Sequence, residues 1–325
     1  AVLCAQPSSG YLAFFLMASK VRPLQIHRLS FKAMGSACEV VLACASQKEA
    51  ETLAKLAIDE VLRIERKYSR YTADSIVAII NQQAGYAPVR CDDESWALFQ
   101  FASQLFEKSD GLFDITSGVL RQAWNFQKPE VPSASKLERL LPLIGWQKVV
   151  LQDHSIALPV VGMEVDLGGF GKEYAADRAA QVLGEKGVAN GYVNLAGDMR
   201  FLGPKPTGEP WMIGIQDPRQ ADQVVATLPM TQGGLATSGD YERFFELNGQ
   251  RYCHVLNPQT GQPVKHWRTV SVTAPAAVVS GCTATMAMLK EKDGLTFLQA
   301  TGFDFLAIDH TGKVHVRQET QAALN

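Results

Sequence analysis

The sequence has no marked excess of charge of either sign. Its 325 residues include 31 Lys and Arg against 33 Asp and Glu, which gives a formal net charge of -2 at pH 7. This balance argues against a protein that binds nucleic acid through the phosphate backbone, because such proteins carry a basic excess. With 46% hydrophobic and 20% charged residues, the composition also excludes a disordered or fibrous chain and predicts a folded, globular one.

The sequence also lacks a cysteine pattern typical of a metal site or a disulfide framework. No two of its cysteines form a CxxC pair, and none has a histidine beside it at metal-ligand spacing. Unpaired thiols in a chain of this length favour a reducing compartment. A cytoplasmic location is therefore expected, with a periplasmic or inner-membrane-associated one as the alternative. The cysteines are Cys4, Cys38, Cys44, Cys91, Cys253 and Cys282.

Long hydrophobic runs are absent as well, so no transmembrane span is predicted. The apolar run over 11–18 falls well short of the ~20 residues that a membrane-spanning helix needs. No basic segment precedes this run, and Cys4 comes before it, which argues against a signal peptide or a lipoprotein leader. We expect residues 1–25 to form an N-terminal extension outside the fold, and residues 26–320 to form the folded domain.

Apolar periodicity predicts helices and strands in a mixed order. The order is not a regular βαβ alternation, so the predicted class is α+β, with mixed, largely antiparallel sheets, flanking helices and two closely joined lobes. Helices are predicted over 47–68, 93–108, 136–141, 172–186 and about 283–299. Strands are predicted over 37–44, 148–151, 155–158, 162–167, 191–195, 211–215, 224–228, 234–237, 243–247, 269–273, 305–309 and 314–317.

The most informative segment is VDLGGFGKEYAAD, over 165–177. Its glycines predict a tight turn that leads into a helix beside Lys172. Glycines let the backbone approach a ligand closely, and a helix N-terminus favours a phosphate group. The spacing is that of neither a P-loop nor a GxGxxG turn, and a purely structural turn is an equal alternative.

Four further polar residues lie in segments that suggest a site, and three of them have a structural alternative. Asp198 in NLAGD is also read as part of a polar turn, and Asp114 in GLFDITSG as a solvated loop acid. His254 in HVLNPQTG follows a predicted strand, where a lone histidine is more often a satisfied core residue. Thr237 lies in ATSGDY, just before the strand that leads to His254.

Taken together, these segments resemble the ApbE family of FAD:protein FMN transferases. The resemblance runs from about residue 26 to 308 and depends on the order of the pieces, none of which is decisive alone. The pieces are MGS at Met34, SRYTADS around Tyr71 with Asn81 beyond it, GLFDITSG, VDLGGFGKEYAAD, NLAGD, ATSGDY and HVLNPQTGQPV.

The resemblance implies a reaction, two cofactors and a set of site residues. The hydroxyl of a Thr or Ser in an acceptor flavoprotein would attack FAD, which would leave phosphoester-linked FMN and release AMP with the help of Mg²⁺. His254 would act as the general base, and the carbonyl of Gly169 with the side chain of Thr285 would bind the metal. The residues implied to bind FAD are Met34, Tyr71, Leu112, Phe113, Asp114, Asp166, Lys172, Asp198, Thr237 and Val255.

The sequence departs from the family at the metal motif. The family usually reads close to ADALST, in which an Asp lies four residues before the Thr, whereas this chain has Gly281 in that place. Loss of the carboxylate predicts weaker Mg²⁺ binding unless another acid, for example Asp240, replaces it. Two alternatives therefore stay open: a Mg²⁺-dependent FAD pyrophosphatase, and an FAD-binding protein without catalytic activity.

Overall fold

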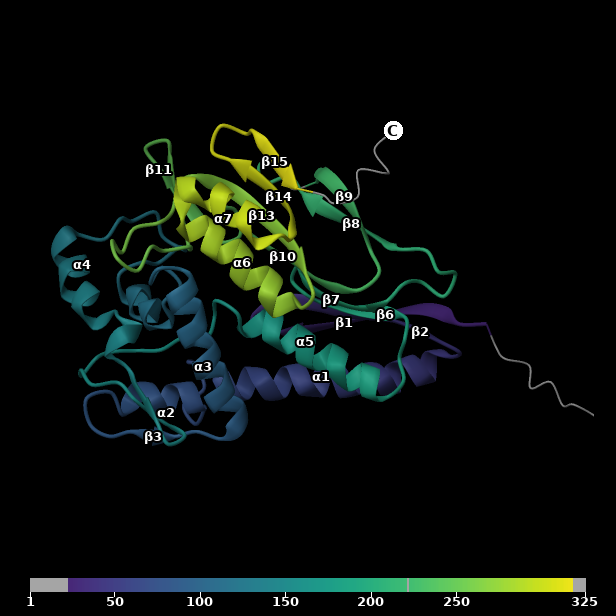
Figure 1. Cartoon of the computed structure of the whole chain (residues 1–325), viewed down its shortest axis with the longest axis horizontal. Coiled ribbons are helices and arrows are strands. Elements are labelled where there is room, and N and C mark those ends of the chain that lie inside the picture. Colours follow the sequence, from purple (N-terminus) through teal and green to yellow (C-terminus); the bar gives the residue numbers. More distant parts are fainter. Residues whose placement is uncertain (1–22, 221, 318–325) are drawn as a thin grey trace, which may run out of the picture.

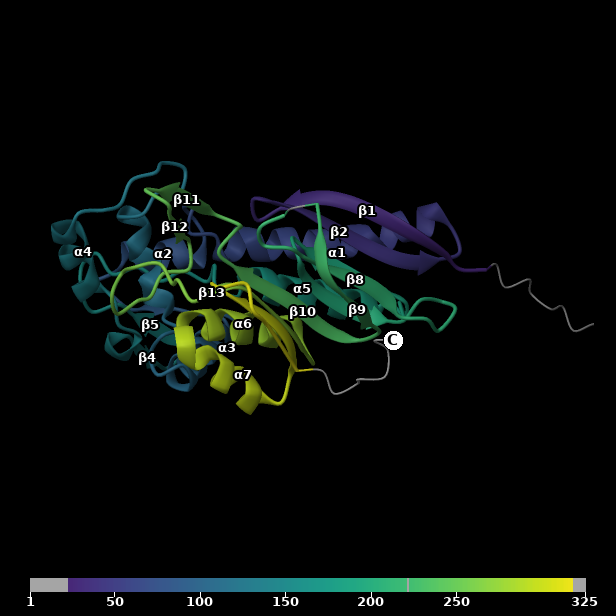
Figure 2. The same ribbon diagram turned by 90° about the horizontal axis from the view of Figure 1, so that it is seen from above.

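The computed structural model describes residues 23–220 and 222–317. Its main element is an eight-stranded sheet in which all neighbouring strands are antiparallel (Figures 1 and 2). Across the sheet, the strands are β1 (Gln25–Ala33), β2 (Ser36–Cys44), β6 (Gly191–Leu195), β7 (Asp198–Gly203), β10 (Gly233–Gly239), β13 (Trp267–Ala274), β14 (Asp304–Asp309) and β15 (Val314–Arg317).

Both faces of this sheet are apolar, because side chains alternate along each strand. In β2, Val40 and Leu42 belong to the main core, whereas Val41 belongs to a second cluster on the opposite face. Helices cover the first face, and the hairpin β8–β9 covers the second (Figure 1). These elements are α1 (Gln47–Tyr68), α5 (Gly171–Glu185), α6 (Ala277–Leu289), α7 (Gly294–Thr301), β8 (Trp211–Gln216) and β9 (Val224–Met230).

The remaining elements gather at one end of the molecule, on the left of Figures 1 and 2. The main core continues into them, since Phe99 and Ile156 belong to the same buried cluster as Val40. The two lobes therefore share one core. The elements are α2 (Ile76–Gln82), β3 (Val89–Arg90), α3 (Asp93–Lys108), η1 (Ile115–Gln122), α4 (Ala134–Leu140), η2 (Leu141–Leu143), η3 (Trp146–Lys148), β4 (Val150–Gln152), β5 (Ser155–Ala157), β11 (Phe244–Leu247) and β12 (Gln250–Cys253).

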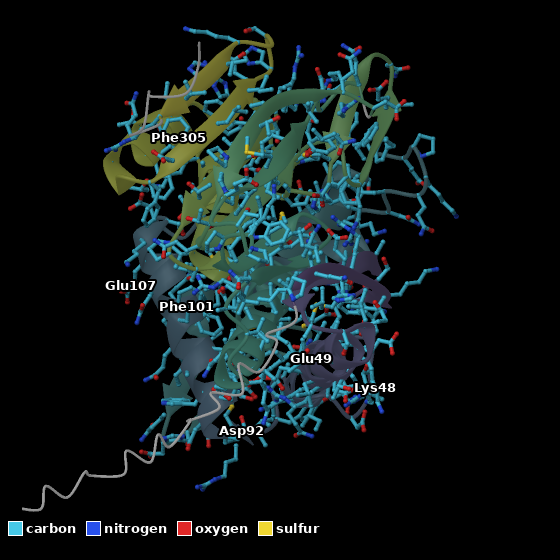
Figure 3. The ribbon with its side chains drawn as sticks, turned by 90° about the vertical axis from the view of Figure 1, so that its right-hand side faces the viewer. Lys48, Glu49, Asp92, Phe101, Glu107 and Phe305 are labelled. Carbon is cyan, nitrogen blue, oxygen red and sulfur yellow. The ribbon has the colours of Figure 1, made fainter. Side chains whose placement is uncertain are left out.

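The helices predicted over 47–68 and 93–108 are confirmed as α1 and α3. Each begins after an N-cap side chain that accepts a hydrogen bond from a free backbone N–H of the first turn. Ser46 accepts from the N–H of Glu49, and Asp92 accepts from the N–H of Ser95 at 2.9 Å (Glu49 and Asp92 are labelled in Figure 3). The α+β class with largely antiparallel sheets is confirmed too.

The prediction of a single helix over 283–299 is wrong. The chain forms α6 from Ala277 and α7 from Gly294, with η4 (Glu291–Asp293) between them. Glu291 has a left-handed backbone with φ 51°, which interrupts a right-handed helix. Its carboxylate accepts hydrogen bonds from the N–H groups of Lys265 and His266, at 3.0 and 2.7 Å. These contacts, which lie outside the helical pattern, hold the break in place.

The strand predicted over 162–167 is also wrong, and β1 is a strand that the periodicity did not predict. Val165 donates to the side chain of Asn81 at 2.7 Å and accepts from it at 3.0 Å, so its backbone is satisfied without a neighbouring strand. β1 is the edge strand of the sheet, and most of its side chains are exposed or half-buried. Such a strand carries little apolar periodicity.

Within the described ranges, we find no helix that is both long and apolar enough to cross a membrane. The first described strand begins at Gln25, beside the boundary predicted between the extension and the fold. Cys4 and most of the predicted extension lie outside the described residues.

Candidate functional site

Helices α5 and α6 are held in register by one carboxylate. Asp177 of α5 accepts hydrogen bonds from the N–H groups of Ala277 and Val278, at 2.9 Å each, and so caps the start of α6. One turn earlier on α5 lies Glu173, and one turn later on α6 lies Gly281. A Cβ placed on Gly281 would lie 2.6 Å from Cγ and 2.7 Å from Cδ of Glu173. The two helices therefore run antiparallel where they touch.

This register brings the two predicted metal ligands toward the same end of the helix pair. Residues four apart share a face of a helix. Thr285 lies four residues after Gly281 on α6, and Gly169, in the glycine turn, lies four residues before Glu173. The hydroxyl of Thr285 is 2.8 Å from that of Ser238 on β10. Alternation along β10 places Ser238 on the helix-covered face and Thr237 on the opposite one, where Thr237 pairs with Ser271 at 2.7 Å.

The glycine turn exposes its backbone, as the sequence predicts. Gly168 and Gly169 are exposed, and they precede the first turn of α5. A Cβ on Gly169 would lie 3.1 Å from Cζ of Phe113, so the turn passes directly over that buried ring. Leu112 packs against the main core beside it. These backbone groups are thus open to a ligand, with Phe113 beneath them.

Lys172, at the start of α5, is paired inside the protein. Its Nζ lies 2.5 Å from Oδ2 of Asp198, whose side chain is 4% exposed. Burial lowers the pKa of Lys172, but the charges of Asp198 and Glu173 outweigh this effect and hold the pKa above its ordinary value. Asp198 is the first residue of β7, directly after the turn at 196–197. The ion pair therefore joins α5 to the central sheet.

Glu173 is the most unusual polar residue of this region. It is buried, and among the described residues its Oε2 has no hydrogen-bond partner. Burial raises its pKa well above the ordinary value; Asp198 raises it further, and Lys172 opposes the shift. A buried carboxylate without a partner is costly. Glu173 lies inside VDLGGFGKEYAAD but is not among the predicted site residues, because its proximity to Gly281 exists only in the folded chain.

His254 follows β12 directly, and its side chain is only partly exposed. Its N–H donates to the carbonyl of Arg243 at 3.0 Å, while Nδ1 is buried with no partner in the described part of the chain. Burial, together with the positive charges of Arg243 and Lys172, lowers its pKa to about 4. The imidazole is therefore neutral at physiological pH. The carbonyl of the next residue, Val255, accepts from Val264 at 3.0 Å.

A second group surrounds Asp166. Arg70 donates to Asp166 at 2.5 Å and to the hydroxyl of Tyr71 at 2.9 Å, with its guanidinium 5.0 Å from the Tyr71 ring centre. Tyr71 is 79% exposed, which leaves its ring open to a planar ligand. Asp166 also accepts from the N–H of Gly168 at 3.0 Å. Arg70 is not among the predicted site residues, although it lies beside Tyr71 in SRYTADS.

Two of the predicted FAD-binding residues have internal hydrogen bonds that account for their positions. Asp114 is buried, and its carboxylate accepts from the N–H groups of Thr116 and Trp146, at 2.8 and 3.0 Å. Met34 lies at the tip of the β1–β2 hairpin with φ 51° and donates to Glu65 at 2.6 Å. Both shape loops of the fold, whatever else they contact.

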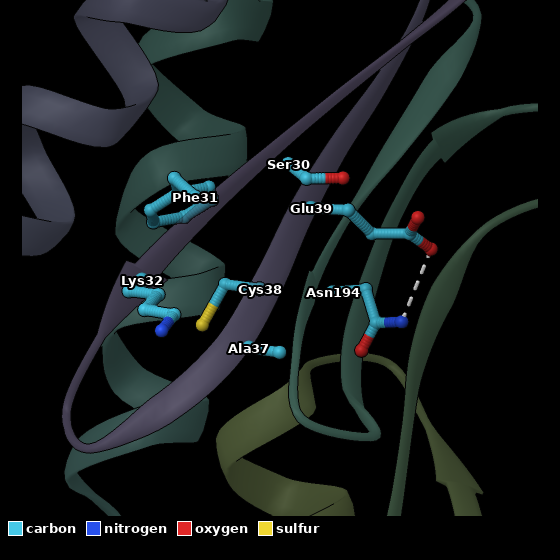
Figure 4. Close-up of a pocket in the computed structure, with 7 residues that line it drawn as sticks. All are labelled: Ser30, Phe31, Lys32, Ala37, Cys38, Glu39 and Asn194. Carbon is cyan, nitrogen blue, oxygen red and sulfur yellow. Dashed lines mark hydrogen bonds between the residues drawn. The ribbon is translucent and has the colours of Figure 1, made fainter.

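The described residues contain no group of three or more His, Cys, Asp or Glu that could hold a metal. Asp240, the acid considered as a replacement ligand, accepts two hydrogen bonds from Arg219 at 2.7 Å each. A cavity of about 450 Å³ lies between β1, β2 and β6 (Figure 4), and none of the predicted site residues lines it. Its lining residues are Ser30, Phe31, Lys32, Ala37, Cys38, Glu39 and Asn194.

Comparison with known proteins places this geometry in a family. The profile of the ApbE family matches residues 34–307, a span that contains the glycine turn, both helices and His254. This chain belongs to the ApbE family. The ApbE protein of Thermotoga maritima has a similar structure, with a TM-score of 0.83 and 32% identity over 90% of this chain and 97% of that one.

Curated relatives support the same assignment. The FAD:protein FMN transferase of Treponema pallidum is 32% identical over 276 residues, which cover 74% of this chain and 76% of the relative. The FAD:protein FMN transferase of Salmonella typhimurium is 30% identical over 220 residues, and this match covers 65% of this chain and 63% of the relative.

Proposed function

We propose that this chain transfers FMN from FAD to a Thr or Ser hydroxyl of an acceptor protein and releases AMP. The observation that carries the proposal is the convergence of three features inside the span that matches the ApbE family. These are the exposed turn at Gly168 and Gly169, the α5–α6 helix pair and the neutral imidazole of His254. The relatives described above carry the name of this activity.

The chemistry is the exchange of one phosphorus–oxygen bond for another. The acceptor hydroxyl oxygen forms a bond to the phosphorus of the FMN half, and the bond from that phosphorus to the bridging oxygen breaks. AMP leaves with the bridging oxygen. The hydroxyl proton passes to the imidazole of His254, which is neutral and can accept it. Such a transfer depends mainly on positioning and on charge neutralisation.

FAD would lie across the two groups of residues. The exposed backbone at Gly168 and Gly169 and the N-terminus of α5 suit the pyrophosphate. The exposed ring of Tyr71, stiffened by Arg70, offers a surface for stacking an aromatic ring. Leu112 and Phe113 would support the ligand from below.

The donor set fits a hard divalent cation such as Mg²⁺. The carbonyl of Gly169 and the hydroxyl of Thr285 are oxygen donors of the kind that Mg²⁺ prefers. When bound, the ion would neutralise charge on the phosphate oxygens. A carboxylate is the usual additional ligand, and Gly281 does not supply one.

The proposal is tested by incubating the protein with FAD, Mg²⁺ and an acceptor domain that carries a reactive Thr, next to the same domain with that Thr replaced by Ala. We expect AMP in the solution and covalent flavin fluorescence on the Thr domain only. AMP without labelled acceptor would instead identify a pyrophosphatase. FAD binding without AMP would identify a protein that binds FAD and does not catalyse.

The compartment remains a prediction. The cysteines of the described ranges, Cys38, Cys44, Cys91, Cys253 and Cys282, are buried and free, which suits the reducing cytoplasm. We therefore propose a cytoplasmic location and a cytoplasmic acceptor protein. Nucleic acid is not among the proposed partners, given the net charge of -2.

A further inference from the structure

We propose that Glu173 of α5 is the carboxylate ligand of the divalent cation, in place of the acid that α6 lacks at Gly281. This inference rests on the proposed function, because it concerns the cation that assists the transfer. It assigns the ligand to a different helix from the one that carries Thr285.

The Glu173 side chain and a side chain at position 281 would occupy the same volume. A side chain at position 281 would begin at a Cβ that overlaps Oε1 of Glu173 and lies 2.6 Å from its Cγ. Non-bonded carbon atoms do not approach this closely. The Glu173 carboxylate therefore fills the volume that an Asp at 281 would need, and Gly281 is the residue that leaves room for it.

The unpartnered oxygen of Glu173 also supports a bound cation. Oε2 of Glu173 is buried with no hydrogen-bond partner in the described ranges. A buried polar atom of this kind is rare in native proteins and calls for a missing water, proton or ion. Lys172, the nearest cation on the same helix, is 2.5 Å from Asp198 instead. A divalent cation would supply the direct partner that this oxygen lacks.

Three other acids of this region are already engaged by partners of their own. Asp240 is held by Arg219 and also lies 3.4 Å from Arg251. Asp177 caps α6, and Asp198 pairs with Lys172. Among the carboxylates of the described residues, Glu173 is the one with a buried oxygen that has no partner, and it faces α6 one turn from Thr285.

Binding of Mn²⁺ to the full chain, followed by electron paramagnetic resonance at saturating FAD, tests the assignment without an activity readout. We expect Glu173→Gln to weaken Mn²⁺ binding at least about tenfold, because a direct carboxylate ligand is lost while the shape is kept. Asp240→Asn is the matched control and should bind Mn²⁺ like the wild type. A change of less than tenfold in Glu173→Gln, or a larger loss in Asp240→Asn, would overturn the proposal.

A residue exchange provides a second test. Gly281→Asp alone should lower the melting temperature, since the new side chain meets Glu173. The double variant Glu173→Gly/Gly281→Asp should recover most of that loss and bind Mn²⁺ at least tenfold more tightly than Glu173→Gly. If the exchange restores neither property, the two positions do not share one carboxylate site.

The same samples separate this proposal from the proposed function. Flavin transfer to the acceptor domain is measured on each variant after its Mn²⁺ affinity. A wild-type protein that binds Mn²⁺ through Glu173 yet labels no acceptor would contradict the transferase and leave the ligand assignment standing. Transfer that persists in Glu173→Gln with unchanged Mn²⁺ affinity would contradict the ligand assignment alone.

Discussion

At the scale of single residues, the site is a small buried cluster of charges. Lys172 is the cation that faces Asp198 and Glu173. In its ion pair with Asp198, the Asp198 side chain is almost fully buried. Breaking a buried pair by removing one partner is strongly destabilising, because the other charge stays buried without compensation. The family resemblance implies that Lys172 binds FAD, and the fold also gives it a structural partner in Asp198.

Replacing Lys172 by Met should therefore lower the free energy of unfolding by about 3 kcal/mol, as measured by urea denaturation. The double variant Lys172→Met/Asp198→Asn should recover most of this loss, since both charges are gone. A loss below about 1 kcal/mol in the single variant would contradict a stabilising pair. Titration of the folded double variant with FAD then measures the implied contact of Lys172 with FAD separately, and weaker binding is expected.

His254 gives a pH prediction with a definite sign. Its pKa in the folded protein is about 4, against an ordinary value of 6.5, so the unfolded chain binds a proton between these values that the folded chain does not. The contribution of His254 to stability is therefore present above pH 6.5 and is lost as the pH falls toward 4. Its role as a base should likewise be constant from pH 6 to 8.

Replacing His254 by Ala should slow transfer by about 10²–10⁴-fold while FAD binding stays close to that of the wild type. The decrease should be the same at pH 6 and pH 8. Rates of AMP release at saturating FAD provide the measurement. A variant that transfers FMN at nearly the wild-type rate would remove His254 from the mechanism.

At the scale of elements, the site depends on how closely α6 packs against its neighbours. Asp177 fixes its start against α5, and Ser280 donates to the carbonyl of Gly234 on β10 at 3.0 Å. A Cβ on Gly234 would overlap the backbone of Ala277 and lie 2.5 Å from the carbonyl carbon of Ala276. Backbone cannot move aside as a flexible side chain can.

Gly234→Ala should therefore destabilise the protein by about 1–3 kcal/mol or more, because it forces α6 away from the sheet. The matched control is Gly184→Ala in α5, where an added Cβ meets no atom within 4 Å. That change should be neutral or stabilising by up to about 1 kcal/mol, since Ala is the better helix former. Thermal melts of both variants give the comparison, and equal destabilisation would contradict the packing argument.

Elements with a strong local pattern were predictable, and those set by distant contacts were not. α1 and α3 have clear amphipathic spacing and side-chain caps, so their bounds follow from the sequence. The break at Glu291 depends on hydrogen bonds to Lys265 and His266, which no periodicity reveals. The same holds for the site. The motifs locate Lys172 and His254, but Glu173 meets Gly281 only after two helices have packed.

At the scale of the whole molecule, one continuous hydrophobic core joins the eight-stranded sheet to the lobe that contains α2, α3 and β5. The exposed ring of Tyr71 belongs to the segment between α1 and α2, whereas Thr285 and Ser238 belong to α6 and the sheet. A ligand with two aromatic ends and a central pyrophosphate would thus be held by both lobes at once. In the proposed reaction, such a ligand is cleaved by an acceptor hydroxyl.

The most direct measurement is the ratio of AMP released to FMN covalently bound on an acceptor domain with a single reactive Thr. Intact-mass spectrometry of the acceptor and chromatography of the same reaction give both numbers. We expect one AMP for each FMN attached, and formation of both products about 10²–10⁴-fold more slowly in His254→Ala. AMP in large excess over attached FMN, or an unmodified acceptor at full FAD occupancy, would contradict the proposed reaction.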